Sequence, residues 1–103
     1  MINIDRALRS SIRTGKVVLG SNKAVEVGLS GQAKLIIYAT DCLQDVRMQL
    51  EAMDVPVYGY PGMGKDLGSA CGKPFSVAAL AVIEQGDSEI MALLREIRGV
   101  ENE

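Results

Sequence analysis

The chain has 103 residues, close to the commonest size of a single domain, with an ordinary globular composition of 48% hydrophobic and 23% charged residues. It contains no histidine, which excludes Ser–His and Cys–His nucleophile pairs and metal sites with histidine ligands. No apolar run approaches the roughly 20 residues that span a bilayer, and residues 1–10 lack the apolar stretch of a secretory signal. We therefore expect a single cytoplasmic domain over residues 1–103, without a membrane partner.

The formal net charge of −2 is unevenly distributed along the chain. Residues 1–34 carry six basic and two acidic side chains, whereas residues 35–103 carry five basic and eleven acidic ones. A basic and an acidic part predict an oriented electrostatic surface, although a solvated helix face explains the pattern equally simply. The two cysteines, Cys42 and Cys71, have no CxxC partner, and we expect each to be a small buried or half-buried hydrophobe without a disulfide.

The first part of the chain alternates helical and strand patterns. Apolar residues at four-residue spacing predict a helix over 4–14, which Gly15 ends. Another face of this helix carries three arginines at i, i+3 and i+7, namely Arg6, Arg9 and Arg13. A strand over 16–19 follows, then a helix that Ser21 or Asn22 caps and that runs to about Ser30, then a strand over 33–38.

The second part continues the alternation. The expected elements are a helix over 43–53, a strand over 55–60, a short helix over 66–70, a central strand over 77–83 and a helix over 90–97. The helix over 43–53 should turn Leu43, Val46, Leu50 and Met53 inward, and residues 98–103 should form a frayed tail. Together these elements predict a three-layer α/β/α sandwich with a four-stranded mixed sheet and about five helices.

Residues 59–66, GYPGMGKD, fit seven of the eight positions of the phosphate-binding pattern GxxxxGK[ST]. Asp66 replaces the hydroxyl that would bind magnesium, and its carboxylate would repel triphosphate oxygens. The helix that follows is interrupted by Gly68 and closed by Gly72. We therefore interpret 59–66 as a strand-to-helix connection, and a nucleotide-binding enzyme using this segment is the least favoured alternative. No catalytic residue, metal, cofactor or small-molecule substrate is expected.

Three loops should converge at one edge of the predicted sheet, at residues 20–23, 39–42 and 71–76. The first loop combines a helix N-terminus with Asn22 and Lys23, a surface suited to phosphates and base edges. The last loop combines Lys73 with Phe75, and an exposed aromatic ring of this kind stacks on unpaired bases. Phe75 folding back onto the end of the sandwich is an equal alternative.

Four stretches carry a family resemblance: TGKVVLGSNKAV (14–25), AKLIIYATDC (33–42), VPVY (55–58) and DLGSACGKPFSVAALAVIEQGDSEI (66–90). They resemble the kink-turn RNA-binding proteins of the archaeal and eukaryotic ribosome, and the resemblance extends over residues 4–97. The block at 66–90 is the most specific. It favours the large-subunit thirty-e branch over the branch that binds small nucleolar RNA.

The resemblance implies an α/β/α sandwich without catalytic activity that grips sharply bent rRNA and has neighbouring ribosomal proteins as partners. It also implies RNA contacts at three places. These are Gly20, Ser21, Asn22 and Lys23 before the second helix, Asp41 in the second loop, and Gly72, Lys73, Pro74 and Phe75 in the third. Asp41 stands where relatives often carry asparagine, and Glu26 stands where they are commonly basic. Both departures should weaken binding to an isolated kink-turn, so a non-ribosomal kink-turn protein of a small ribonucleoprotein is the second choice.

Overall fold

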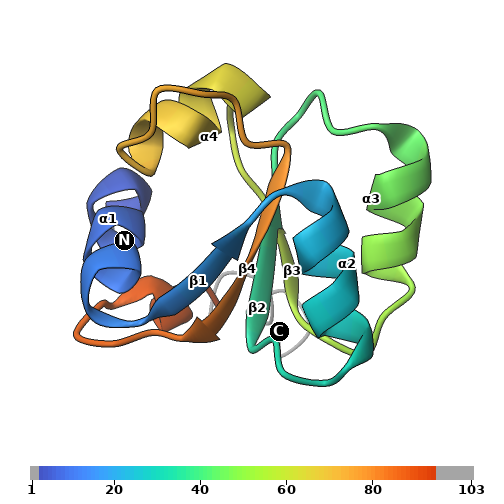
Figure 1. Ribbon diagram of the computed structural model, residues 1–103, viewed down its shortest axis with the longest axis horizontal. Coiled ribbons are helices and arrows are strands. Elements are labelled where there is room, and N and C mark those ends of the chain that lie inside the picture. Colours follow the sequence, from blue (N-terminus) through green and yellow to red (C-terminus); the bar gives the residue numbers. More distant parts are fainter. Residues whose placement is uncertain (1–2, 95–103) are drawn as a thin grey trace, which may run out of the picture.

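The computed structural model describes residues 3–94, and these form one four-stranded sheet with helices on both faces (Figure 1). The strands are β1 (Lys16–Leu19), β2 (Leu35–Tyr38), β3 (Val57–Gly59) and β4 (Ala79–Glu84). Their order across the sheet is β1-β4-β2-β3. Because β4 is antiparallel to both of its neighbours while β2 and β3 are parallel, the sheet is mixed, as expected.

Four α-helices cover the sheet, α1 (Ile4–Thr14), α2 (Ser21–Leu29), α3 (Gln44–Glu51) and α4 (Gly64–Ala70), and a short 3-10 turn, η1 (Ile90–Ala92), follows β4. Figure 1 shows α1 and α4 on one face and α2 and α3 on the other. The expected three-layer sandwich is therefore confirmed. The four α-helices and η1 come close to the expected count of about five.

Alternate residues of the central strands supply the two cores of the sandwich. In β2, Leu35 and Ile37 pack with α1 and α4, while Ile36 packs with α2 and α3. In β4, Leu80 and Val82 face the first core and Ala79 and Ala81 the second. This period of two is the side-chain alternation of a strand, and it explains why a continuous apolar run at 77–83 marks the centre of the sheet.

The first helix is bounded as its sequence predicts. Asn3 accepts a hydrogen bond from the Arg6 amide at 3.1 Å and so caps the N-terminus, and Gly15 is the C-cap. A side chain on Gly15 would collide with the backbone of residues 84–86, where β4 leaves the sheet. Gly15 therefore permits the close approach of two chain segments as well as the end of the helix.

Several element boundaries differ from the prediction. β1 has the predicted bounds, β2, β3 and α3 are shorter than expected, and β4 begins two residues later and ends one residue later than predicted. α4 begins at Gly64 instead of Asp66 because the Asp66 carboxylate accepts a hydrogen bond from the Met63 amide one turn earlier. Leu43 was expected to face inward, but its side chain is 73% exposed because it precedes α3. Ile90 and Leu93 are buried as expected and Leu94 packs against the first core, but residues 90–92 form the 3-10 turn η1. Residues 95–97 of the predicted helix and the tail 98–103 lie outside the described residues.

Candidate nucleic-acid interface

The strand register brings the three predicted loops to one edge of the sheet. Leu19 at the end of β1 pairs with Leu80 near the start of β4, and Tyr38 at the end of β2 pairs with both Ala79 and Gly59. The ends of β1, β2 and β3 and the beginning of β4 therefore share the edge that is uppermost in Figure 1. We refer to the loops 20–23, 39–42, 60–63 and 71–78 at this edge as the loop end.

The first loop positions its polar side chains through an unusual helix start. Gly20 is the N-cap of α2 with φ of 111°, a region that favours glycine, and no side chain caps the helix. The expectation that Ser21 or Asn22 acts as the cap is therefore wrong, because both already lie within the first turn. Asn22 and Lys23 are exposed and Ser21 is half-buried, so the uncapped amides of this turn and two polar side chains face solvent together.

The second loop is fastened to α4 by Asp41. The Gly64 amide donates to Asp41 Oδ1 at 2.8 Å, and the Thr40 amide and hydroxyl both donate to the carbonyl oxygen of Gly62, at 2.8 and 2.9 Å. A carboxylate at the start of a helix is favourable because the first amides there lack partners within the helix. Asp41 remains exposed at the loop end, so its carboxylate both holds α4 and contributes negative charge there.

These contacts also account for the segment 59–66. A phosphate loop works through backbone amides that point at the ligand. Here the Met63 amide donates to Asp66 Oδ2 at 2.9 Å and the Gly64 amide to Asp41 Oδ1. Two carboxylates therefore occupy the amides that a triphosphate would need. This geometry supports the interpretation of 59–66 as a strand-to-helix connection.

The third loop lies against α4 and presents Phe75 to solvent. Gly72 adopts a φ of 77°, the Lys73 amide donates to the carbonyl oxygen of Gly68 at 2.9 Å, and the Val77 amide donates to that of Gly64 at 3.0 Å. The Phe75 side chain is 55% exposed, which decides against its folding back into the core. Gly72 and Pro74 are exposed and Lys73 is half-buried. The structure thus gathers all nine predicted RNA-contact residues at the loop end.

The role of Asp41 leads to a prediction that separates its charge from its hydrogen bond. Asp41→Asn keeps an acceptor for the Gly64 amide, so we expect unchanged stability and RNA binding about two- to fivefold tighter, because one carboxylate is removed. Asp41→Ala also removes the acceptor and should lower the free energy of unfolding by about 1 kcal/mol. Denaturant unfolding and RNA titration test both, with Asp45→Asn as the charge control. Equal free energies of unfolding for the alanine and asparagine variants would contradict a stabilising role for the hydrogen bond between Asp41 and the Gly64 amide.

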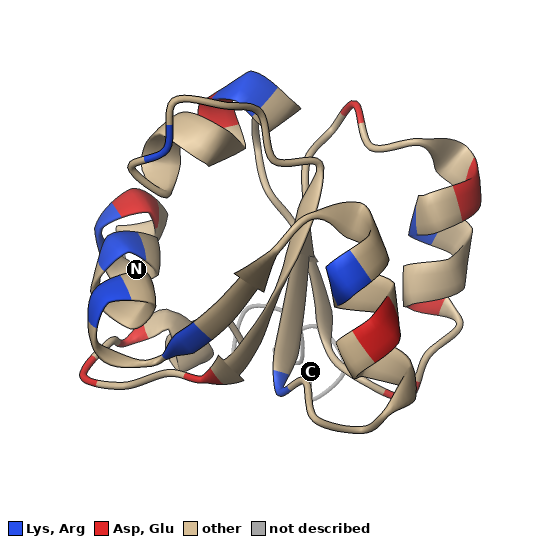
Figure 2. Cartoon of the chain, viewed as in Figure 1, with Lys and Arg blue, Asp and Glu red and all other residues tan. Residues whose placement is uncertain are grey.

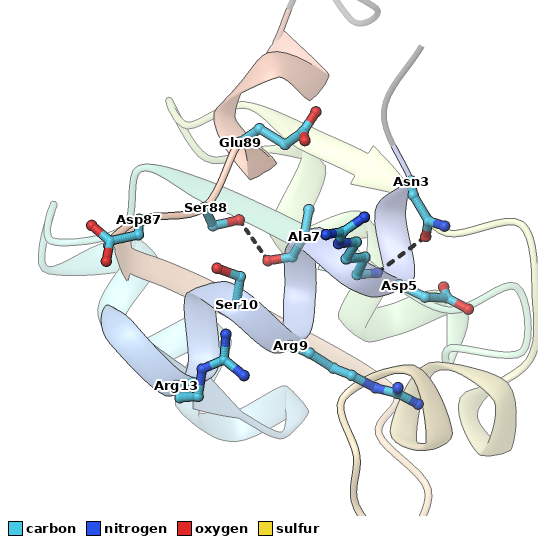
Figure 3. A pocket seen from close by; sticks show the side chains of 10 residues that line it. Asn3, Asp5, Ala7, Arg9, Ser10, Arg13, Asp87, Ser88 and Glu89 are labelled. Atoms are coloured by element: carbon cyan, nitrogen blue, oxygen red, sulfur yellow. Dashed lines mark hydrogen bonds between the residues drawn. The ribbon is translucent and has the colours of Figure 1, made fainter.

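The arginines of α1 lie on the flank of the molecule (Figures 2 and 3). A pocket between α1 and residues 87–89 is lined by three basic and three acidic side chains, namely Arg6, Arg9, Arg13, Asp5, Asp87 and Glu89. In addition, Arg9 donates from Nε to the carbonyl oxygen of Ala70 at 3.3 Å and therefore joins α1 to α4. Because opposite charges balance in this pocket, the loop end is the better candidate for a polyanion.

The titratable groups with perturbed pKa values stay protonated at neutral pH. Burial raises the pKa of the Cys71 thiol to about 11, and burial followed by the Asp41 carboxylate raises that of Cys42. Both cysteines are free, as expected. Burial, and then a hydrogen bond in which its hydroxyl donates to Asp5 Oδ1 at 2.8 Å, raises the pKa of Tyr60. None of the three is activated as a nucleophile, since that would require a lowered pKa.

Within 3–94, no group of three or more carboxylate or thiol side chains is placed to hold a metal ion. No helix in the same part of the chain is long and apolar enough to cross a membrane.

Sequence reasoning missed the residues that join the loops to one another. Thr40 donates to the carbonyl oxygen of Gly62, and the Gly64 amide donates to Asp41. The groups of Gly62 and Gly64 in these bonds belong to the backbone, which leaves no side-chain pattern in the sequence. One signal was available: Asp66 lies three residues after Met63, the spacing at which an acidic side chain caps a helix N-terminus.

Comparisons with known proteins identify the family of the chain. Residues 2–92 match the ribosomal protein L7Ae/L30e/S12e/Gadd45 family. The chain is 76% identical over 103 residues to the large ribosomal subunit protein eL30 of Methanothrix thermoacetophila, covering all of both chains. It is 40% identical over 91 residues to the protein of the same name from Methanosarcina mazei, covering 88% of each chain. It is 41% identical over 100 residues to that from Methanopyrus kandleri, covering 93% of this chain and 92% of the relative. The chain therefore belongs to the ribosomal protein L7Ae/L30e/S12e/Gadd45 family.

Proposed function

We propose that the chain is a structural RNA-binding protein of the large ribosomal subunit, and that it recognises bent, kink-turn-like rRNA through the loop end. The full-length relative with 76% identity is named as a protein of that subunit, which places the chain on the ribosome in the cytoplasm and among structural proteins instead of enzymes. The observation that carries the RNA-binding site is the convergence of three loops at one edge of the sheet.

The first and third loops offer RNA different kinds of contact. Lys23, Lys73 and the uncapped amides at the start of α2 can pair with phosphates, while Asn22 has a donor and an acceptor for base edges. Phe75 provides an exposed ring for an unpaired base. The sheet fixes the spacing of these groups, so the protein reads the shape of a bent backbone more than a base sequence.

Two acidic positions favour a ribosomal role over an autonomous one. Asp41 lies at the loop end and Glu26 on the exposed side of α2, and both add negative charge near bound phosphates. A protein that seeds a small ribonucleoprotein must bind its kink-turn unaided. On the ribosome, in contrast, surrounding RNA and neighbouring ribosomal proteins share the binding free energy.

A mobility-shift titration tests the proposal with two RNAs, one that contains a kink-turn and one that lacks its tandem G·A pairs. We expect tighter binding to the first RNA, and an affinity that falls steeply with salt because phosphate contacts release counterions. Asn22→Ala should weaken binding without lowering the melting temperature, since the side chain is exposed. Equal weak binding to both RNAs would refute kink-turn recognition and leave only general phosphate affinity.

A further inference from the structure

Exposed apolar side chains concentrate at the loop end. Five large hydrophobic residues are exposed within 3–94. Met63 at 46% and Phe75 at 55% lie at the loop end, and Leu43 at 73% directly follows its loop 39–42. Isolated exposed hydrophobic residues are normal on a protein surface, but a group at one site is more informative. Phe75 belongs to the interface already described, whereas Leu43 and Met63 do not.

The three residues are neighbours in sequence of one junction in the backbone. Asp41 Oδ1 accepts from the Gly64 amide at 2.8 Å, and a Cβ atom built on Gly64 would lie 3.7 Å from the Cβ atom of Ser76. Leu43 is two residues from Asp41, and Met63 and Phe75 directly precede the other two residues of the junction. Leu43 and Met63 are thereby held close to the loop that carries Phe75.

Leu43 and Met63 also occupy positions where an apolar residue costs stability. Leu43 is the N-cap of α3 and its side chain accepts no hydrogen bond from the helix. Met63 is the N-cap of α4, where the Asp66 carboxylate accepts a hydrogen bond from the Met63 amide. Serine, threonine, aspartate and asparagine are strongly preferred at N-caps. Two helices that start at the same edge thus both begin with an exposed apolar residue, which their own stability does not explain.

The charges around these residues suit a nucleic acid. Lys23 and Lys65 are exposed and Lys73 is half-exposed, and Figure 2 shows basic residues near the start of α2 and of α4 and in the loop after α4. The nearby carboxylates of Asp41 and Asp66 each accept a backbone amide, which offsets part of their negative charge. Apolar side chains between cations match the structure of unpaired nucleotides, whose bases have apolar faces and whose phosphates are anionic.

We propose that Leu43 and Met63, together with Phe75, form an apolar surface that contacts unpaired bases next to the bend in the RNA. This inference rests on the proposed function. The side chains of Leu43 and Met63 pack on base faces without reading base identity, and they add contacts beyond the three predicted loops.

The chain offers matched controls for a test. L43S and M63S remove the proposed contacts, while L29S and M48S remove side chains that are 74% and 61% exposed on α2 and α3. The affinity of each full-length variant for a kink-turn RNA is measured by mobility shift, with 2-aminopurine at the unpaired positions to report base contact. We expect L43S and M63S to lose about fivefold in affinity each and to change the 2-aminopurine signal, whereas L29S and M48S bind as the wild type does.

Stability provides a second readout with the opposite sign. Because serine is a better N-cap than leucine or methionine, the melting temperatures of L43S and M63S should stay equal or rise while RNA affinity falls. Wild-type affinity in both variants would overturn the inference, as would an equal loss in all four variants. So would normal RNA binding combined with loss of incorporation into ribosomal subunits, which would indicate a protein partner. If the wild type itself does not distinguish kink-turn from control RNA, the proposed function fails first.

Discussion

Gly68→Ala is expected to lower the free energy of unfolding by about 3 kcal/mol and to weaken RNA binding in the same variant. A Cβ atom on Gly68 would lie 1.9 Å from the carbonyl oxygen of Phe75, 3.0 Å from its carbonyl carbon and 3.3 Å from the Cα atom of Ser76. All three are backbone atoms, so no side-chain rotation relieves the overlap. The loop that carries Phe75 and Lys73 must move away from α4, and with it the candidate stacking surface.

Gly28→Ala is the matched control for this prediction. Gly28 also lies inside a helix, but a Cβ atom there would meet the sulfur of Met53 at 2.4 Å, the end of a flexible side chain that can turn aside. Alanine is also favoured over glycine in a helix by up to about 1 kcal/mol, so we expect a small net change in stability. Denaturant unfolding of both variants, followed by titration with kink-turn RNA, tests the pair. Wild-type stability in Gly68→Ala would contradict the close packing of the loop on α4.

The architecture of this protein could be predicted because the periodicities are unambiguous. Apolar residues at four-residue spacing mark α1, and the apolar run at 77–83 marks the strand that is covered on both faces. The edge where the loops converge follows from the alternation of helices and strands alone. Burial of one stripe or one face is a local property of the sequence, so it needs no knowledge of distant contacts.

The outcomes that the sequence did not predict depend on a helix boundary or on contacts between segments far apart in the chain. The spacing of apolar residues predicts that Leu43 faces inward with Val46 and Leu50. The helix begins after Leu43, however, so Leu43 lies outside the helical pattern and faces solvent. From the sequence alone, Asp41 is interpreted only as a negative charge that weakens RNA binding. Its hydrogen bond to an amide 23 residues later gives it a structural role that no local pattern indicates. The exposure of Phe75 likewise depends on how closely its loop packs on α4.

Phe75→Ala is expected to reduce the affinity for kink-turn RNA by about 1–3 kcal/mol, or roughly 5- to 150-fold, while leaving the melting temperature almost unchanged. The side chain is 55% exposed and belongs to neither core cluster, so its removal leaves no cavity within the sandwich. Phe75→Tyr retains an aromatic face and should keep most of the affinity, whereas Phe75→Leu keeps apolar area without a ring. Unfolding of Phe75→Ala at a much lower temperature would show instead that the ring supports the core.

Salt dependence separates stacking from charge in the same loop. Phe75→Ala removes no charge, so the logarithm of its affinity should fall with the logarithm of salt concentration at the wild-type slope, displaced to weaker binding. Lys73→Ala removes one cation, and its slope should become shallower by about one phosphate contact. Titrations at several salt concentrations give both slopes. A shallower slope for Phe75→Ala would mean that losing the ring also shifts the neighbouring lysine away from the RNA, and the ring would then position Lys73 instead of stacking on a base.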